Sequence, residues 1–364
     1  MKIALVYDHV NKIGGAERIL TALHELFPQA PLYTAVFNAN SAFWTKSFTV
    51  QSSFMQKLPL ASTHHELYPG LPFLAFEQFD FTKYDVVISI TSAEAKAVIT
   101  GPQTLHICYS LTPTRYLWSH RYDYFHHNLK HFLSMPILSW LRIYDYYTSW
   151  RPDRYVAISQ TVHDRICKYY RQESKVIYPP VDTDTFVPGP KNDGDYYLVV
   201  SRLVEYKHIE IAITACNQLR HPLKIVGVGL AYKKLRKMAG ATIEFLGAVT
   251  EKELVGYYQS CKALLFTADE DFGITMVEAL ACGKPVVAYR RGGASEIVTA
   301  GKTGEFFSEQ KAESLMLTLG RFEKKRYNDS SCRKKALSFS KEIFKSSFLK
   351  FLKEEWGRFN GPIL

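Results

Sequence analysis

One short stretch, from Ala263 to Gly283, constrains the fold more than any other part of the chain. It opens with four apolar residues, Ala263–Phe266, which predict a buried strand. An acidic loop follows, and from Ile274 the pattern predicts a short helix that ends at a glycine. A strand, a loop and a helix in this order form the repeating unit of a doubly wound α/β sheet.

Two glutamates stand eight positions apart in this stretch, Glu270 in the loop and Glu278 inside the helix. The first amides of the helix are unpaired donors, and the helix dipole adds positive potential there, so an anion can bind. A carboxylate beside an anion site would repel the anion, unless a neutral, hydroxyl-rich group lies over Glu270 while its phosphate lies over the helix. A nucleotide sugar has that shape. The simpler alternative makes Glu278 a surface carboxylate and Glu270 an acid that starts a helix.

This pattern, E-x7-E with Phe-Gly after the first acid, resembles the signature of the retaining glycosyltransferases of family 4, which have the GT-B fold. The resemblance implies that Glu270 contacts hydroxyls of the donor sugar and that Glu278 holds the ribose. It also implies that the backbone of Phe272, Gly273 and Ile274 donates to the sugar and the phosphate.

The sequence departs from the family pattern at Asp271, where the family usually has glycine; the spacing is unchanged. Arg202 and Lys207 keep an R-x4-K spacing that resembles the diphosphate clamp of the family. Two cations would neutralise the charge that develops on a leaving diphosphate, so no metal or other cofactor is expected. Gly229, in a glycine loop after a strand, and Val249, placed like the nucleobase-contacting loop of the family, complete the expected donor site.

The chain begins with a predicted strand over residues 2–7, and Gly14 and Gly15 then open a helix. Paired glycines at such a turn let a phosphate approach the backbone and the helix amides, although a simple tight turn explains them equally well. The turn lacks the G-x-G-x-x-G dinucleotide pattern, which argues against a dehydrogenase. It is similar to the first loop of family 4 enzymes, so both glycines are predicted to face the donor phosphate.

Two more strands are predicted at residues 84–90 and 104–109, and loops after strand carboxyl ends carry ligands in such sheets. These loops place five residues near the acceptor or the sugar: Ser92, Lys96, Leu111, Thr112 and Arg115. The second loop resembles a bacterial subgroup of family 4 that builds surface polysaccharides, often mannosyltransferases, in which His-Thr-Pro precedes Arg-Tyr. Leu111 stands where that histidine would be, so the identity of the donor sugar stays open.

The length of 364 residues fits two domains better than one. A linker rich in proline and glycine near residue 190 places the boundary, with a first domain over 1–188, a second over 189–340, and a C-terminal helix over 341–364 that returns to the first. A net charge of +10 indicates anionic partners: nucleotide phosphates, a lipid diphosphate, an anionic membrane or nucleic acid. The six cysteines show no paired spacing for zinc or disulfides and predict free thiols.

Between residues 115 and 175 the sequence mixes cations with aromatic residues. Aromatics beside cations suit the interface of an anionic membrane, whereas aromatics at helical spacing are also typical of a core. Binding of single-stranded nucleic acid is a third interpretation, against which the absence of any RNA-binding motif argues. No signal-peptide core and no apolar run of about 20 residues is present, so a cytoplasmic protein with at most peripheral contact to the plasma membrane is expected.

The sequence therefore predicts an α/β protein of GT-B type, with two Rossmann-like doubly wound domains facing across a cleft. The predicted activity is transfer of a hexose, with configuration retained, from a nucleotide-diphosphate sugar to a glycan or a polyprenyl-diphosphate-linked acceptor. GDP-mannose is the favoured donor and a UDP-hexose its alternative. Two other functions remain open: a nucleotide-sugar 2-epimerase of the same fold, which needs no acceptor, and a basic nucleic-acid-binding protein, which leaves the acidic motif unused.

Overall fold

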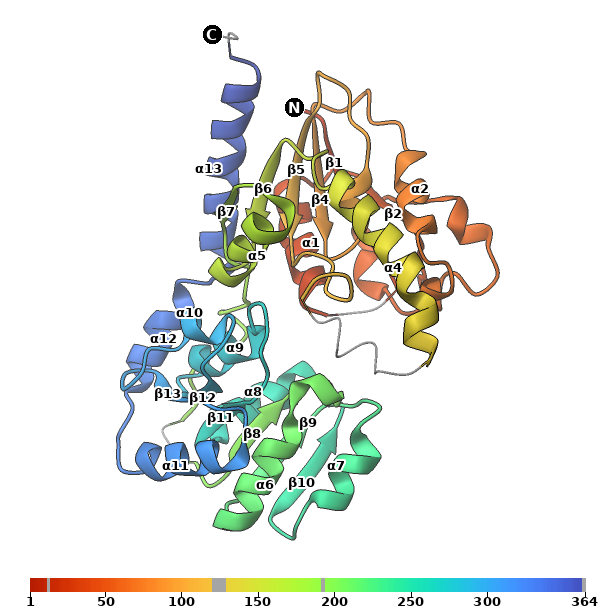
Figure 1. The fold of residues 1–364 in the computed structure, drawn as a ribbon. Helices are drawn as coiled ribbons and strands as arrows, with labels where there is room; N and C mark the ends of the chain where they lie inside the picture. Colours follow the sequence, from red (N-terminus) through yellow and green to blue (C-terminus); the bar gives the residue numbers. More distant parts are fainter. Residues whose placement is uncertain (12–13, 120–128, 191–193, 362–364) are drawn as a thin grey trace. The chain divides into compact units, whose positions relative to one another are not determined.

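The computed structural model describes residues 1–11, 14–119, 129–190 and 194–361, without the side chains of 129–134. The chain divides into two compact units (Figure 1). The first comprises Met1–Pro180 and Phe344–Leu364, and the second Val181–Ile343.

The first unit is built on a parallel sheet of seven strands in the order β3-β2-β1-β4-β5-β6-β7. Its strands are β1 (Ile3–Tyr7), β2 (Leu32–Thr34), β3 (Val50–Ser52), β4 (Val86–Thr91), β5 (Leu105–Ser110), β6 (Arg154–Ala157) and β7 (Ser174–Val176). Its helices are α1 (Gly15–Leu26), α2 (Leu71–Glu77), α4 (Leu129–Thr148), α5 (Gln160–Tyr170) and most of α13 (Lys341–Phe359). Short 3-10 helices are η1 (Phe43–Ser47), η2 (Phe54–Lys57), η3 (His65–Leu67) and η4 (Ala95–Ala97).

The second unit is built on a parallel sheet of six strands in the order β10-β9-β8-β11-β12-β13. Its strands are β8 (Tyr197–Val200), β9 (Leu223–Val226), β10 (Ile243–Gly247), β11 (Ala263–Phe266), β12 (Val286–Tyr289) and β13 (Gly304–Phe307). Its helices are η5 (Glu205–Lys207), α6 (Ile209–Leu219), α7 (Tyr232–Met238), α8 (Glu251–Ser260), α9 (Ile274–Ala281), α10 (Ala294–Ile297), α11 (Ala312–Phe322) and α12 (Asp329–Leu337).

Each sheet reverses its strand order once. In the first unit the chain runs outward from β1 through β2 to β3 and then returns to place β4 on the other side of β1. In the second unit it runs from β8 to β10 and returns to place β11 beside β8. Ligands of doubly wound sheets bind at the carboxyl ends of the two strands that flank such a reversal. The loops after β1 and β4, and those after β8 and β11, are therefore the places where the fold builds sites.

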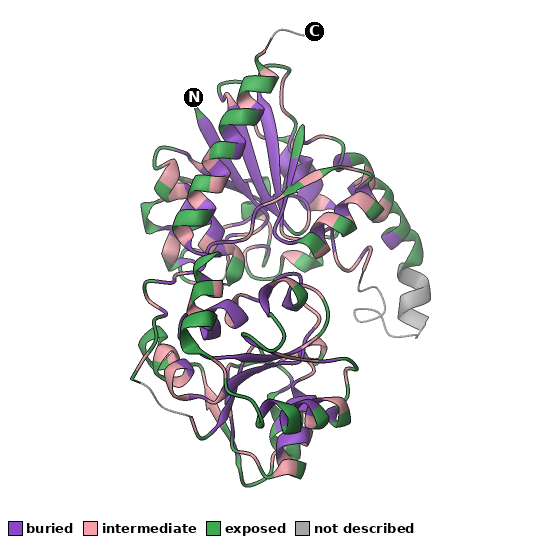
Figure 2. Ribbon diagram, turned by 90° about the vertical axis from the view of Figure 1, so that its left-hand side faces the viewer, coloured by how far each residue is buried: buried purple, intermediate pink, exposed green. Residues whose placement is uncertain are grey.

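The strands are apolar because helices cover both faces of each sheet, and Figure 2 shows them buried while the helices expose their outer turns. The last helix illustrates how a distant segment joins a core. Phe344 and Phe348 of α13 are buried with ring centroids 6.0 and 6.4 Å from that of Tyr109 in β5. Glu355, nearer the C-terminal end of the helix, forms an ion pair with Arg154 of β6. The C-terminal helix thus packs as an element of the first unit.

The division between the units falls at Pro180, before the linker that the sequence suggests. The physical reason is that the segment after it is bonded to the second unit. The amide of Val181 donates to the carbonyl of Phe339 at 2.9 Å, and Arg333 donates to the carbonyl of Phe186 at 2.6 Å. Residues 191–193 of the predicted linker lie outside the described residues.

In the basic and aromatic segment, helix α4 has both buried and exposed apolar side chains among those that are described. Leu138 and Leu141 are buried in the core of the first unit. The opposite side of the helix, and Trp150 just after it, expose large apolar side chains; those on the helix are Met135, Ile137, Trp140, Ile143 and Tyr147. No helix among the described residues has the length and apolar character to cross a bilayer.

Candidate functional site

An ion pair joins the two loops at the strand reversal of the second unit. Lys207, at the end of η5 after β8, contacts the carboxylate of Glu270 in the loop after β11. Lys207 is buried, whereas the side chain of Glu270 is 22% exposed. The hydroxyl of Thr267 donates to the carbonyl of Lys207 at 2.8 Å, so the backbone of one loop is fastened to the other. The predicted cation and the predicted carboxylate therefore meet at one place.

Arg202 is connected to this pair through a tyrosine that the sequence reasoning missed. Its guanidinium donates to the hydroxyl of Tyr206, and the ammonium of Lys207 lies 5.0 Å from the centre of the Tyr206 ring. A cation over an aromatic face is attracted to the ring quadrupole. Tyr206 thus contacts both cations of the R-x4-K pattern.

The acidic loop is positioned by a second pair of glycines, Gly292 and Gly293. The amide of Gly293 donates to the carbonyl of Glu270 at 2.8 Å. A Cβ atom at Gly292 would lie 2.0 Å from the carbonyl oxygen of Glu270, and one at Gly293 would lie 2.2 Å from that of Phe272. Only residues without a side chain allow this close approach, so the glycine pair fixes the backbone that carries Glu270.

The helix after the loop begins in the way an anion site requires. Gly273 precedes α9 with φ of +94°, a left-handed conformation that favours glycine, and no side chain caps the helix start. Phe272 is buried with its ring centroid 5.5 Å from that of Phe339, and Ile274 is half-buried. The first amides of α9 therefore follow directly on the loop of Glu270.

Glu278 is buried inside the second unit, at 2% exposure, and its carboxylate accepts from the hydroxyl of Tyr258 at 2.9 Å. The alternative that made it a surface carboxylate is therefore wrong. A carboxylate held in such a place needs hydrogen-bond donors, because burial without them is costly. Tyr258, on α8, supplies one and was not foreseen.

The two remaining donor-site predictions lie farther along the sheet. A Cβ atom at Gly229 would lie 2.3 Å from the carbonyl oxygen of Leu203, so this glycine lets the loop after β9 cross the loop after β8. Val249 is half-buried after β10, the outer strand two positions from β8.

In the first unit the strand reversal is bridged by Asp8, which follows β1 and was not singled out from the sequence. Its carboxylate accepts from the hydroxyl of Thr91 at 2.6 Å and from the amides of Ser92 and Ala95, both at 2.8 Å. The side chain of Ser92 remains exposed. Nearby in sequence, Gly14 and Gly15 are exposed at the start of α1.

The structure corrects the role predicted for Lys96. Its side chain is buried and its ammonium lies 2.6 Å from Asp145 of α4. The carboxylate of Asp145 also accepts from Thr114 at 2.8 Å, Trp118 at 2.7 Å and Tyr170 at 2.9 Å. Lys96 therefore stabilises the loops through a buried ion pair. Contact with an acceptor would need an exposed side chain, so Lys96 is not placed to make it.

The turn after β5 carries the other acceptor-side predictions. Leu111 is half-buried, and its amide donates to the carbonyl of Thr91 at 2.7 Å, which ties the loops after β4 and β5 together. The hydroxyl of Thr112 is buried with no hydrogen-bond partner among the described residues. Arg115 is half-buried in the same turn.

Glu94 is a further buried acid of this region, and no sequence pattern singles it out. One oxygen lies 3.4 Å from the hydroxyl of Tyr116, and the other has no partner in the described part of the chain. Burial raises the pKa of Glu94 to about 8, and the negative charge of Asp8 acts in the same direction while Lys96 opposes it. The carboxyl is therefore mostly neutral at pH 7.

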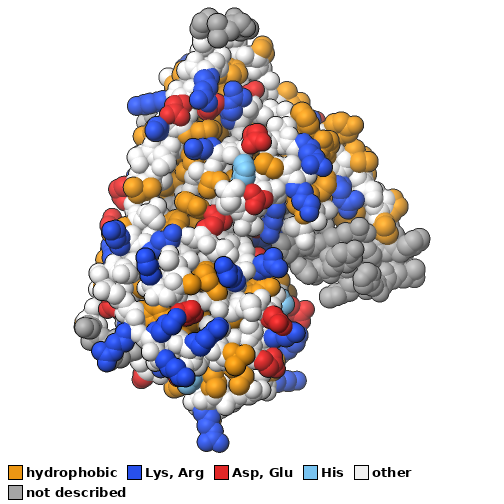
Figure 3. All heavy atoms as spheres, turned by 60° about the vertical axis from the view of Figure 1, so that its left-hand side comes forward, with side chains coloured by type: hydrophobic (Ala, Val, Ile, Leu, Met, Phe, Trp, Pro, Cys, Tyr) orange, Lys and Arg blue, Asp and Glu red, His pale blue; other side chains and the backbone are white. Residues whose placement is uncertain are grey.

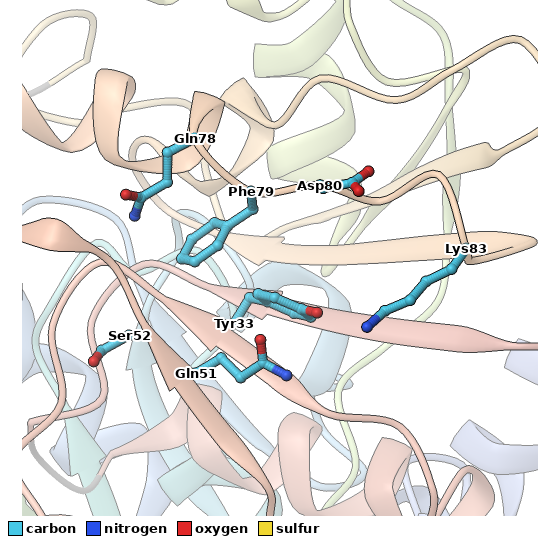
Figure 4. A pocket seen from close by; sticks show the side chains of 7 residues that line it. All are labelled: Tyr33, Gln51, Ser52, Gln78, Phe79, Asp80 and Lys83. Carbon is cyan, nitrogen blue, oxygen red and sulfur yellow. The ribbon is translucent and has the colours of Figure 1, made fainter.

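A cavity of about 400 Å³ opens elsewhere on the first unit (Figure 4). Its lining comes from β2, β3 and the segment between α2 and β4: Tyr33, Gln51, Ser52, Gln78, Phe79, Asp80 and Lys83. None of the predicted site residues belongs to it. Phe79 and Asp80 precede β4, at the end of the strand opposite to the loops that build sites.

Comparison with known proteins agrees with the fold. The family model described as glycosyl transferases group 1 matches residues 181–339. An uncharacterized glycosyltransferase of Methanocaldococcus jannaschii is 30% identical over 165 residues, which are 43% of this chain and 46% of that protein. A GDP-mannose-dependent phosphatidylinositol monomannoside mannosyltransferase of Mycolicibacterium smegmatis is 32% identical over 171 residues, 39% of this chain and 45% of the relative.

Solved structures extend the likeness to nearly the whole chain. HepE of Anabaena, in complex with UDP and glucose, gives a TM-score of 0.75 at 20% identity and covers 97% of this chain and 99% of its own. Sucrose-phosphate synthase of Thermosynechococcus elongatus gives 0.77 at 15% identity over 98% of this chain and 100% of its own. These likenesses establish the fold, and they confirm the predicted GT-B class with two Rossmann-like parts.

The two sheets and their helices thus have the GT-B fold. Residues 181–339 match the model of the group 1 glycosyl transferases, which confirms the resemblance to family 4. The aligned part spans less than half the length of the curated relatives named above, 46% and 45%.

The raised pKa of Glu94 predicts how stability depends on pH. The folded state holds a proton on Glu94 up to about pH 8, whereas the unfolded chain loses it near the ordinary value of 4.5. Between these values the folded state binds more protons, so the free energy of unfolding falls as pH rises, by at most about 1.4 kcal/mol per pH unit for one proton. We expect Glu94→Gln to remove this part of the slope and to stabilise the first unit at pH 8.

Urea unfolding at pH 5 to 8 measures this effect. Tryptophan fluorescence reports on the first unit alone, because all five tryptophans lie in it. Glu354→Gln, at a side chain that is 50% exposed on α13, is the matched control. Equal slopes for the wild type and Glu94→Gln would contradict the prediction.

Proposed function

We propose that this chain is a retaining glycosyltransferase that moves a hexose from a nucleotide-diphosphate sugar to a glycan or a lipid-linked oligosaccharide in surface-polysaccharide synthesis. The observation that supports it most is the contact between Lys207 and Glu270 at the strand reversal of the second unit. A lone sugar site needs no cation there, and a lone phosphate site gains nothing from a carboxylate. A ligand that carries hydroxyls next to phosphates uses both.

In this proposal Glu270 accepts hydrogen bonds from hydroxyls of the donor sugar. Lys207, with Arg202 beyond Tyr206, stabilises the negative charge that grows on the diphosphate as it leaves. The start of α9 behind Gly273 offers amides and the positive end of a helix dipole to the same phosphates. Glu278, which is held by Tyr258, is proposed to bind the ribose.

The proposed reaction needs no separate base. The bond from the anomeric carbon to the phosphate oxygen breaks, and a bond from the same carbon to an acceptor oxygen forms on the same face. The proton of the acceptor hydroxyl passes to the oxygen of the leaving phosphate. The products are the glycosylated acceptor and a nucleoside diphosphate, so the balance is complete without a metal.

GDP-mannose is the donor we propose, with a UDP-hexose as its alternative. A GDP-mannose-dependent relative supports the first, and the structural likeness to an enzyme crystallised with UDP and glucose supports the second. Leu111 offers an apolar side chain where the polysaccharide subgroup has histidine, so it removes one polar contact to the sugar. A screen of nucleotide sugars for slow donor hydrolysis decides between them.

A nucleotide-sugar 2-epimerase of this fold remains the alternative enzyme. It would release a free sugar without any acceptor, so product analysis separates it from a transferase. Binding of nucleic acid receives less support from the surface, because basic and acidic side chains intermix on the face shown in Figure 3 and do not form one basic stripe.

The ion pair yields a direct test of activity. We expect Glu270→Gln and Lys207→Met each to lower the rate of sugar transfer by about 100-fold to 1,000-fold, the usual loss for one group that stabilises developing charge. Transfer is measured with radiolabelled GDP-mannose and UDP-glucose and a lipid-linked acceptor. Glu305→Gln and Lys325→Met are the controls, because they change a second ion pair of the same unit with a separation of 2.6 Å and side chains that are 13% and 50% exposed. Transfer at the native rate by Glu270→Gln would refute the assignment.

We further propose that the exposed side of α4 contacts an anionic membrane that holds the acceptor. Ile137, Trp140, Ile143 and Tyr147 follow one another at helical spacing and are between 53% and 69% exposed. Tryptophan and tyrosine favour the membrane interface, and the net charge of +10 favours an anionic one.

Sedimentation with vesicles containing phosphatidylglycerol tests this contact. The double variant Trp140→Ser with Tyr147→Ser is expected to lower the bound fraction, with a partition constant reduced about tenfold or more. Leu317→Ser, at a side chain of the second unit that is 73% exposed, is the control and is expected to bind like the wild type. Unchanged binding of the double variant would place the contact elsewhere.

A further inference from the structure

Three side chains that neither the sequence reasoning nor the proposed function uses gather at the outer edge of the first sheet. His163 and Cys167 lie one turn apart on α5, so they share one face of the helix. Arg171 then adopts a left-handed conformation with φ of +57°, which turns the chain back and brings Glu173 to the start of β7. Among the described residues these three groups meet with their ligand atoms all within 4.8 Å of one another.

The distance between the side chains of His163 and Cys167 matches the distance between two ligands of one metal ion. The Sγ atom of Cys167 lies 3.6 Å from Nε2 of His163. Zinc in a tetrahedral site binds thiolate sulfur at about 2.3 Å and imidazole nitrogen at about 2.0–2.1 Å, which places the two ligand atoms roughly 3.5 Å apart. The helix therefore holds them at the distance that a shared zinc ion requires.

The imidazole of His163 is also oriented as metal-binding histidines are. Its Nδ1 atom lies 2.9 Å from the hydroxyl and 3.1 Å from the carbonyl of Ser174 in β7. A proton on Nδ1 donated to that carbonyl leaves the lone pair on Nε2, which faces Cys167. Such an outer hydrogen bond fixes the tautomer and the ring plane, and it raises the basicity of the ligand nitrogen.

We propose that His163, Cys167 and Glu173 form a zinc-binding site that clamps α5 to the edge strand β7. The ligand set is one nitrogen, one sulfur and one oxygen, a combination of soft and hard donors that suits zinc better than magnesium or calcium. Three protein ligands leave the fourth tetrahedral position to water. The sequence does not predict this site, because the scattered cysteines lack the paired spacing that is typical of zinc sites.

Binding has a defined proton balance. Glu173 binds as a carboxylate and His163 as a neutral imidazole, while Cys167 must lose its thiol proton as the sulfur–zinc bond forms. Each zinc ion bound near neutral pH therefore releases one proton to the buffer, and affinity rises with pH.

Titration of the reduced full-length chain with zinc chloride, in buffers of different ionisation enthalpy, measures both the stoichiometry and the proton release. We expect Cys167→Ser and Glu173→Gln to weaken binding by at least about tenfold to 100-fold. Asp164→Asn is the matched control: this carboxylate accepts from Gln160 at 2.9 Å on the same helix and lies outside the cluster. Glu173 is exposed, so its variant tests the ligand without disturbing the core.

Cobalt gives a second readout that folding defects do not imitate. Cobalt(II) at this site should produce a thiolate-to-cobalt charge-transfer absorption that is present in the wild type and in Asp164→Asn and absent in Cys167→Ser. Zinc binding of equal affinity in the wild type and Cys167→Ser, or a cobalt spectrum without a thiolate band, would overturn the proposal. Neither result would bear on the transferase proposal, because the cluster shares no residue with it.

Discussion

The contact between Lys207 and Glu270 is the interaction on which the functional account depends. Opposite charges attract strongly when water is partly excluded, and here they join loops from β8 and β11, the two strands that flank the reversal of the second sheet. The pair owes its position to backbone features more than to its own charges. Gly292 and Gly293 allow the acidic loop to pass close by, and Thr267 holds the carbonyl of Lys207. An arrangement fixed in this way presents a cation and an acid to a ligand with little reorganisation.

In the first unit, buried carboxylates connect the loops at the strand reversal. Asp8 takes hydrogen bonds from the loop after β4, and Asp145 accepts from four donors on three segments of the chain. A buried carboxylate with several donors is stable, whereas removal of one partner leaves an uncompensated charge. These hydrogen bonds fix the positions of the loops relative to one another within the first unit. Lys96 and Asp145 are therefore positioning groups.

Much of the fold could be predicted because its signals are local. Apolar runs such as Ala263–Phe266 and the glycine that ends α9 mark strands and helices by their own composition. The charged pair was also predictable, since the spacing of Arg202 and Lys207 and that of the two glutamates are sequence patterns. What these patterns could not give is which side chains become buried. Asp145 meets Lys96 across 49 positions of the chain, and nothing near either residue announces the partner.

The same limit explains why the other contacts of the site could not be predicted from the sequence. Tyr258 reaches Glu278 from a different helix, and Tyr206 acquires its role only because the loop folds back on itself. The cluster of His163, Cys167 and Glu173 depends on one left-handed residue, Arg171, whose conformation the sequence does not signal. Long-range hydrogen bonds and single unusual dihedral angles are properties of the folded chain, so only the structure supplies them.

Hydrogen–deuterium exchange with added UDP, GDP and single-stranded RNA tests the central claim most directly. The account predicts that a nucleoside diphosphate slows exchange of the amides in residues 202–207 and 270–276, that Lys207→Met abolishes this protection, and that RNA does not produce it. Protection confined to other segments, or equal protection in wild type and Lys207→Met, would contradict it.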